Sequence, residues 1–210
     1  GLHESQSRMM ENMIGRSLPF WSHFHPKLKA LFHDALSDVD LRRFYEGVNR
    51  VAPSFIRVEA DEVTYNLHIL LRFDLEKQLV GGSLSVKDLP EAWNAQMEEV
   101  LGLIPPDDAQ GVLQDIHWSG GMFGYFPTYS LGNLYAAQFF DALQRCVSDW
   151  RRQVEEGRFH DILGWLRENI HKHGRVYPAG DLCTRVTGQA LDPKYLLDYL
   201  EEKFGDIYGF

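Results

Sequence analysis

The sequence lacks most features of exported, membrane-spanning or nucleic-acid-binding proteins. It has only 2 cysteines, Cys146 and Cys183, too few for a disulfide scaffold. No apolar run approaches the roughly 20 residues that cross a bilayer. Basic residues are outnumbered, with 21 Lys+Arg against 30 Asp+Glu and a net charge of −9, so a dense phosphate-binding surface is missing. We therefore expect a cytoplasmic protein that binds neither nucleic acid nor membranes.

The composition is that of a folded globular protein. Hydrophobic residues make up 44% of the 210 residues, aromatic residues 13% and charged residues 24%, which excludes a disordered chain. The chain opens Gly1-Leu2-His3 with no methionine, in the middle of motif-like sequence. We therefore expect these 210 residues to be a piece of a longer protein.

Apolar residues recur mostly at helical spacing. Over residues 62–78 a face is formed by Val63, Leu67, Leu70, Leu71 and Leu75, with Asp61 placed to cap the helix. Similar patterns predict helices over residues 5–14, 25–35 with Pro26 in the first turn, 40–51, 88–101, 129–153, 159–170 and 192–204.

Extended structure is scarce in this pattern. Residues 55–58 are short and β-branched after Pro53, and a second extended piece is predicted near residues 115–118. No linker is long enough to divide the chain. The sequence predicts a mainly α fold, with at most a short β element near 55–58 and 115–118, in a single α-rich domain over residues 1–210.

Three polar clusters stand beside glycines or apolar runs, at residues 3–8, 56–61 and 111–118. The first is consistent with a solvated helix start, because an acid near a helix N-terminus is favourable. The second is consistent with an ion pair between Arg57 and Asp61 around a helix cap. The third runs into the aromatic, glycine-containing loop of residues 119–129, and so many polar groups there are costly unless they line a cavity.

The clusters contain three motifs in order: His3-Glu4-Ser5-Gln6, Ile56-Arg57-x-x-Ala60-Asp61 and Gly111-x-x-Gln114-Asp115-x-His117-Trp118. Together they resemble the HEXXH zinc carboxypeptidases of the thermostable carboxypeptidase Taq type. The resemblance extends over essentially the whole chain, which looks like the C-terminal part of such an enzyme. It implies a zincin-like helical carboxypeptidase lobe.

The resemblance implies a role for each motif residue. Glu4 resembles the third zinc ligand of a His₂Glu site, with His3 beside it in a supporting role. Arg57 resembles the residue that binds the C-terminal carboxylate of a peptide, which suits a planar guanidinium. Either Glu59 or Asp61 would then orient Arg57 or cap the helix.

The third motif implies hydrogen-bonding groups for catalysis. His117 resembles a donor to the tetrahedral intermediate or to the substrate backbone, and Gln114 a substrate-binding residue. Tyr129 resembles the phenol that stabilises the oxyanion, and Tyr125 competes with it for that role.

The defining HEXXH helix of that family does not occur in this sequence. Its two histidines hold zinc and its glutamate activates the water. The pairs His23/His25 and His171/His173, like His68, lack metal-site spacing with a carboxylate. Zinc is thus expected in a complete enzyme, while this chain alone is expected to be inactive because a metal site needs three or four protein ligands.

Two functions remain open at this point. The first is a zinc-dependent carboxypeptidase acting on peptides with a free C-terminal carboxylate, as a homodimer, with a separate N-terminal part that supplies HEXXH and restores activity when added. The alternative is a non-catalytic peptide-binding or scaffold module that binds the carboxylate through Arg57 without metal.

Overall fold

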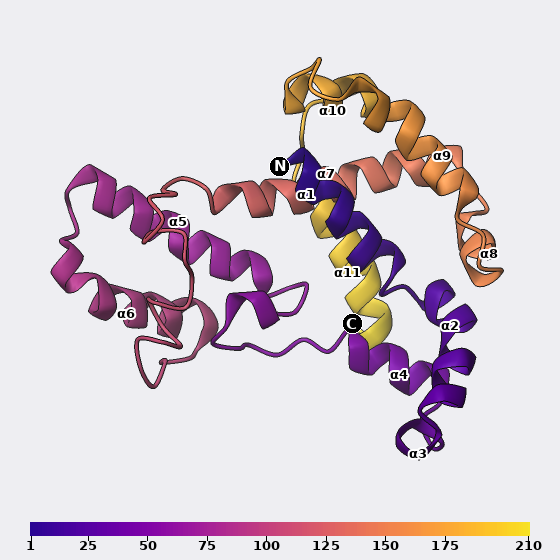
Figure 1. Cartoon of the computed structure of the whole chain (residues 1–210), viewed down its shortest axis with the longest axis horizontal. Coiled ribbons are helices and arrows are strands. Elements are labelled where there is room, and N and C mark those ends of the chain that lie inside the picture. Colours follow the sequence, from indigo (N-terminus) through magenta and orange to yellow (C-terminus); the bar gives the residue numbers. More distant parts are fainter. The chain divides into compact units, whose positions relative to one another are not determined.

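A computed structural model describes all of residues 1–210 and contains helices but no strands (Figure 1). The mainly α prediction is therefore confirmed. No helix is both long and apolar enough to cross a membrane. The chain forms two compact units: the terminal unit, residues 1–49 with 131–210, and the middle unit, residues 50–130. Each unit is described by itself, and the single domain predicted above stays a prediction.

The terminal unit is built around a core of apolar side chains from helices at both ends of the sequence. Met9, Phe139, Leu143, Val154 and Ile162 are fully buried in it. The unit contains α1 (Leu2–Arg8), the π-helix η1 (Met9–Ile14), α2 (Leu18–Leu31), α3 (His33–Leu36), α4 (Leu41–Val48), most of α7 (Pro127–Cys146), α8 (Trp150–Glu155), α9 (His160–Asn169), η4 (His171–His173), α10 (Ala179–Thr187) and α11 (Lys194–Tyr208).

The middle unit contains η2 (Arg57–Glu59), α5 (Tyr65–Gly81), η3 (Val86–Asp88), α6 (Leu89–Leu101) and the first residues of α7. Helices α5 and α6 lie side by side (Figure 1) and bury Leu71, Leu75, Trp93 and Met97 between them. Gly82 ends α5 with a φ of 76°, a left-handed conformation that only glycine adopts at little cost. A second small cluster, of Tyr65, Ile69 and Phe126, lies in the same unit.

The buried stripe of α5 differs from the predicted face. Leu71 and Leu75 are buried as expected, but Leu70 is 51% exposed. Polar residues take buried positions on this helix instead: His68, Arg72 and Glu76. The predicted face was wrong in part because the prediction from apolar spacing counted only apolar side chains as buried.

Both predicted extended pieces are wrong as strands. At residues 55–58 the backbone turns into η2, where the amide of Glu59 bonds to the carbonyl of Ile56 and the amide of Arg57 bonds to the Gln114 side chain. At residues 115–118 the carbonyl of His117 accepts the amide of Met122 in a turn. Because local and side-chain groups already satisfy this backbone, no strand pairing forms.

Three helix predictions also need correction. The helix predicted over 25–35 begins at Leu18, because Ser17 caps it by accepting the Phe20 amide, so Pro26 lies inside it. The helix predicted over 129–153 is broken between Cys146 and Trp150. Helix α10 was not predicted at all.

Candidate functional site

An aspartate shared by two buried arginines is the centre of the middle unit's polar cluster. Asp115 Oδ1 accepts from Arg57 Nη2 at 2.6 Å, and Asp115 Oδ2 accepts from Arg72 Nε at 2.7 Å. Arg57 is 6% exposed and Arg72 is 0% exposed. One carboxylate thus faces two guanidinium groups, and the three side chains together carry one excess positive charge.

The loop residue Gln114 fixes the backbone next to Arg57. Its Oε1 accepts the Arg57 amide at 2.9 Å, while its Nε2 donates to the carbonyls of Phe55 and Gln110, each at 2.9 Å. These bonds join η2 to the loop that carries the third motif. The structure thus brings Gln114 to Arg57, and its contact with substrate stays a prediction.

Aromatic side chains surround the Arg57 guanidinium. The hydroxyl of Tyr65 accepts from Arg57 Nη1 at 3.0 Å, and the ring of Tyr129 lies 5.0 Å from the guanidinium carbon. The ring of Phe126 lies 5.7 Å from the same atom. Aromatic faces attract a guanidinium, so this enclosure helps to hold the charge in place.

His117 has one ring nitrogen near Tyr129 and the other near the shared aspartate. Its Nε2 is 2.9 Å from the Tyr129 hydroxyl, and its Nδ1 is 3.8 Å from Asp115 Oδ1. The imidazole lies over the Phe126 ring, with centroids 4.3 Å apart. Tyr125 is near, with its ring centroid 5.7 Å from that of His117, but it is largely exposed and its hydroxyl has no bond to the histidine.

The charges of this cluster shift its ionisation. Burial acts to lower the pKa of Arg57, but the hydrogen bond and charge of Asp115 outweigh it, and the pKa is raised. Burial lowers the pKa of Arg72 to about 10, so it stays cationic at neutral pH. For Asp115, burial acts against ionisation, but the two arginines hold its pKa below the usual value.

Both histidines of the middle unit are neutral at neutral pH. Burial lowers the pKa of His117; Asp115 acts in the opposite sense and the two arginines reinforce the decrease. For His68, burial and then the charges of Arg72 and Arg57 lower the pKa to about 4. Neither ring nitrogen of His68 has a hydrogen-bond partner, although the side chain is fully buried.

The residues that were predicted to orient Arg57 do not contact its guanidinium. Glu59 is exposed, whereas Asp61 Oδ1 accepts the amides of Val63 and Thr64, each at 2.9 Å. Asp61 therefore organises the turn before α5, whereas the N-cap position of α5 itself is Thr64, which has no side-chain cap bond. The carboxylate that contacts the Arg57 guanidinium is that of Asp115.

The structure places Glu4 in the terminal unit, on α1. Its carboxylate lies 3.4 Å from Arg8 Nε, and it is partly exposed on α1. No group of three or more His, Cys, Asp or Glu side chains among the 210 residues could hold a metal ion. The residues present therefore do not form a metal site by themselves.

Glycine 132 allows α1 to pack closely on α7. A Cβ atom at Gly132 would lie 2.7 Å from Glu4 Cγ and 2.8 Å from Glu4 Cβ. Because the second atom is attached directly to the backbone, the Glu4 side chain cannot simply rotate away. Gly132 thus allows Glu4 of α1 to pack against α7.

We expect Gly132→Ala to destabilise the terminal unit by about 1–3 kcal/mol, the cost of overpacking a close contact. Gly164→Ala is the matched control, because a Cβ there meets nothing within 4 Å and alanine favours a helix by about 1 kcal/mol. Urea unfolding followed by hydrogen exchange in α1 and α7 measures both. Equal stability of the two variants would contradict the close packing.

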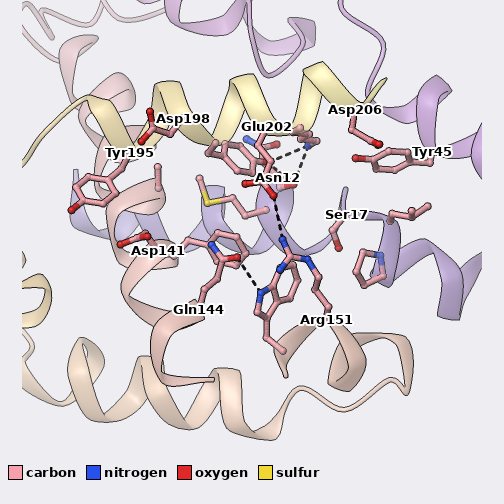
Figure 2. A pocket seen from close by; sticks show the side chains of 18 of the residues that line it. Asn12, Ser17, Tyr45, Asp141, Gln144, Arg151, Tyr195, Asp198, Glu202 and Asp206 are labelled. Carbon is pink, nitrogen blue, oxygen red and sulfur yellow. Dashed lines mark hydrogen bonds and ion pairs between the residues drawn. The ribbon is translucent and has the colours of Figure 1, made fainter. Parts of the chain in front are cut away.

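The terminal unit has a cavity of about 560 Å³, bounded by α7, α8 and α11 (Figure 2), which was not predicted from the sequence. Carboxylates of Asp141, Asp198 and Glu202 line it, and Glu202 lies 3.5 Å from Arg151. Its size is in the range of ligand pockets. None of the residues predicted from the motifs lines it.

Two members of the Arg57 cluster were missed as functional residues. Asp115 was quoted within the third motif but given no role. Arg72 was not singled out, although a charged residue three residues before Leu75 on a buried stripe is a signal that could have been noticed. Such a charge is costly in a core unless it is paired, so its presence indicates a partner elsewhere in the chain.

Comparisons with known proteins agree over almost the whole chain. The model of the carboxypeptidase Taq (M32) metallopeptidase family matches residues 1–204. The chain is 51% identical to thermostable carboxypeptidase 1 of Thermus thermophilus over 209 residues, covering 100% of the chain and 41% of the relative. It is 43% identical to carboxypeptidase 1 of Bacillus subtilis over 208 residues, covering 99% and 42%.

A solved structure gives the same result. The M32 carboxypeptidase from Deinococcus radiodurans R1 matches with a TM-score of 0.97 at 43% identity, covering 100% of this chain and 42% of that one. The chain therefore spans about two fifths of the length of the proteins it matches.

Proposed function

This chain belongs to the carboxypeptidase Taq (M32) metallopeptidase family, and from that premise we propose that it carries the carboxylate-binding part of an enzyme that releases C-terminal amino acids from peptides. The substrates are peptides with a free C-terminal carboxylate. The proposed activity is that of the whole enzyme, because this chain covers only 41% of the length of the Thermus thermophilus relative.

The observation that carries the proposal is the state of the Arg57 guanidinium. Of its five N–H groups, those of Nε and one of Nη2 point to Asp115 and one of Nη1 to Tyr65. One N–H remains on each terminal nitrogen, which is the pair that binds a carboxylate end-on. The excess positive charge of the cluster favours such an anion, and its burial strengthens the attraction.

The hydrogen-bonded pair of His117 and Tyr129 would serve the reacting carbonyl. Tyr129 lies against the Arg57 guanidinium and has its hydroxyl on His117, so both groups are near a carboxylate bound to Arg57. In the proposal the Tyr129 hydroxyl donates to the developing oxyanion. Gln114 holds the Arg57 backbone in place by accepting its amide. Tyr125 is the weaker choice because it lacks the bond to His117.

The metal is part of the proposal at family level, since the matched family is one of metallopeptidases. Zinc is the proposed ion and Glu4 its proposed ligand from this chain. The side chains present do not form a metal site by themselves. We also propose that the enzyme is a cytoplasmic homodimer and that a separate part supplies HEXXH. Both points rest on the family resemblance alone.

A second proposed function involves peptide binding without catalysis. In that alternative the chain is a non-catalytic peptide-binding or scaffold module, which binds the carboxylate through Arg57 with no metal requirement. It shares the carboxylate site with the first function. The two differ in whether hydrolysis appears when the rest of a family enzyme is supplied.

We expect the chain to bind an N-acetylated dipeptide with a free carboxylate at least tenfold more tightly than its C-terminal amide. Arg57→Lys should lose about tenfold of the affinity for the acid, because charge-assisted bonds contribute about 1.5–3 kcal/mol and lysine lacks the planar fork. Titration calorimetry at low salt measures both values.

Arg50→Lys is the control, since Arg50 is exposed in the same unit and should leave both affinities unchanged. Equal binding of the acid and the amide by the unsubstituted chain would refute the carboxylate site.

A further inference from the structure

Three side chains of the proposed site converge on one carboxylate. Asp115 Oδ1 accepts the shortest bond from Arg57 and Oδ2 the bond from Arg72, with a longer contact of 3.4 Å from Arg57 Nε to Oδ2, and His117 Nδ1 lies 3.8 Å from Oδ1. We infer that Asp115 is a positioning residue that orients the Arg57 fork and holds the His117 proton on Nδ1. The inference rests on the proposed function for what the site acts on, but its geometry is independent of it.

Arg72 binds the aspartate through Oδ2. Its Nη1 donates to the carbonyl of His68 at 2.8 Å, and its guanidinium lies 4.6 Å from the Trp93 ring centroid. Arg72 is thereby fixed to both α5 and α6. Because Asp115 Oδ2 is bound to this fixed cation, the carboxylate has a defined orientation, and its Oδ1 edge is turned to Arg57.

That edge determines which N–H groups of Arg57 are left for a ligand. Asp115 accepts from Nε at 3.1 Å and from Nη2 at 2.6 Å, so it occupies the side of the guanidinium plane. The end of the plane, with one N–H on each terminal nitrogen, then stays available. Without Asp115 the plane could rotate, and the end-on pair would lose its fixed direction.

The same carboxylate selects one tautomer of His117. A negative oxygen 3.8 Å from Nδ1 favours the proton there, which leaves Nε2 as an acceptor. The Tyr129 hydroxyl, 2.9 Å from Nε2, must then be the donor of their bond. The tyrosine proton is thus held toward the histidine until a stronger acceptor arrives.

The groups that face His117 from the surrounding elements support a neutral ring. Arg57 of η2 and Arg72 of α5 disfavour the imidazolium, whereas Asp115 and Glu76 favour it. Burial adds to the effect of the arginines, and the pKa of His117 is lowered. At neutral pH the question is therefore which nitrogen carries the single proton.

The test is nitrogen NMR of the histidine rings in the full chain at neutral pH. We expect His117 to be mainly the Nδ1–H form, and Asp115→Asn to reduce that form to below half, because neutral imidazole without a charged neighbour prefers Nε2–H. Glu59→Gln is the matched control, an exposed acid in the same region that should leave the tautomer unchanged.

Tyr129→Phe keeps the inference testable should Asp115→Asn fail to fold. If Asp115 sets the tautomer, the Nδ1–H form persists when the tyrosine hydroxyl is removed. A switch to Nε2–H in that variant would overturn the inference, and so would an Nε2–H form in the unsubstituted chain or an unchanged tautomer in folded Asp115→Asn.

Binding of the dipeptide acid separates this inference from the proposed function. In folded Asp115→Asn we expect the preference for the acid over the amide to fall at least fivefold. One result would separate the two claims: a tautomer shift in Asp115→Asn together with no preference for the acid in the unsubstituted chain. It would support the positioning role of Asp115 and refute the proposed function.

Discussion

Replacing Asp115 with alanine is expected to destabilise the middle unit by about 3–5 kcal/mol, the cost of removing one partner from a buried ion pair. The loss is large because two cations depend on this carboxylate. Arg72 is 0% exposed and Arg57 6% exposed, so neither can recover its hydration without unfolding. We expect a larger fraction of Asp115→Ala molecules to have this unit unfolded at room temperature.

Hydrogen exchange in α5 and α6 measures this loss separately from the terminal unit. Asp108→Ala is the control, because Asp108 is an exposed residue of the same loop region. That variant should change exchange little. If Asp115→Ala costs no more than Asp108→Ala, the arginines are not held by Asp115 and the cluster is wrongly described.

Acid is expected to destabilise the middle unit through His68 by about 3 kcal/mol, at 1.36 kcal/mol per unit of pKa change. The folded pKa is about 4 and the unfolded value is 6.5. Between these values the unfolded chain binds a proton that the folded chain rejects. The contribution is therefore fully present above pH 6.5 and is lost as the pH falls to about 4.

His68→Phe should remove this part of the pH dependence. At neutral pH the variant should be as stable as the unsubstituted chain or more so, because both His68 nitrogens lack hydrogen-bond partners. Unfolding of α5 by hydrogen exchange at several pH values is the measurement, and exposed His33→Gln is the control. An unchanged slope in His68→Phe would show that His68 is not the acid-sensitive group.

Helices with local start and stop signals could be predicted from the sequence. Helix α6 begins at Leu89 and ends at Leu101, as the proline near its start and Gly102 after it indicated. Helix α2 was misjudged because Pro26 resembles a start signal while Ser17 caps the helix earlier. The helix predicted over 129–153 could not be divided, because the break before Trp150 contains neither glycine nor proline.

The site was predictable only through the resemblance. Arg57, His117 and Tyr129 were assigned from motif positions, and the structure places all three in one cluster. The charge of Arg72 on an apolar stripe indicates a buried partner, but it could not identify Asp115, because their contact joins residues 43 positions apart. The strand predictions failed because the Arg57 amide bonds to the Gln114 side chain, 57 positions away, and because a local turn joins His117 and Met122.

The most direct test of the carboxypeptidase assignment is a chimera in which this chain replaces the matching residues of the Thermus thermophilus relative. The products released from an N-blocked dipeptide acid and from its amide would be measured with metal present. We predict release of the C-terminal amino acid from the acid only, and a large loss with Arg57→Lys. Cleavage of the amide as readily as the acid, or no cleavage by a folded, metal-loaded chimera, would contradict the account.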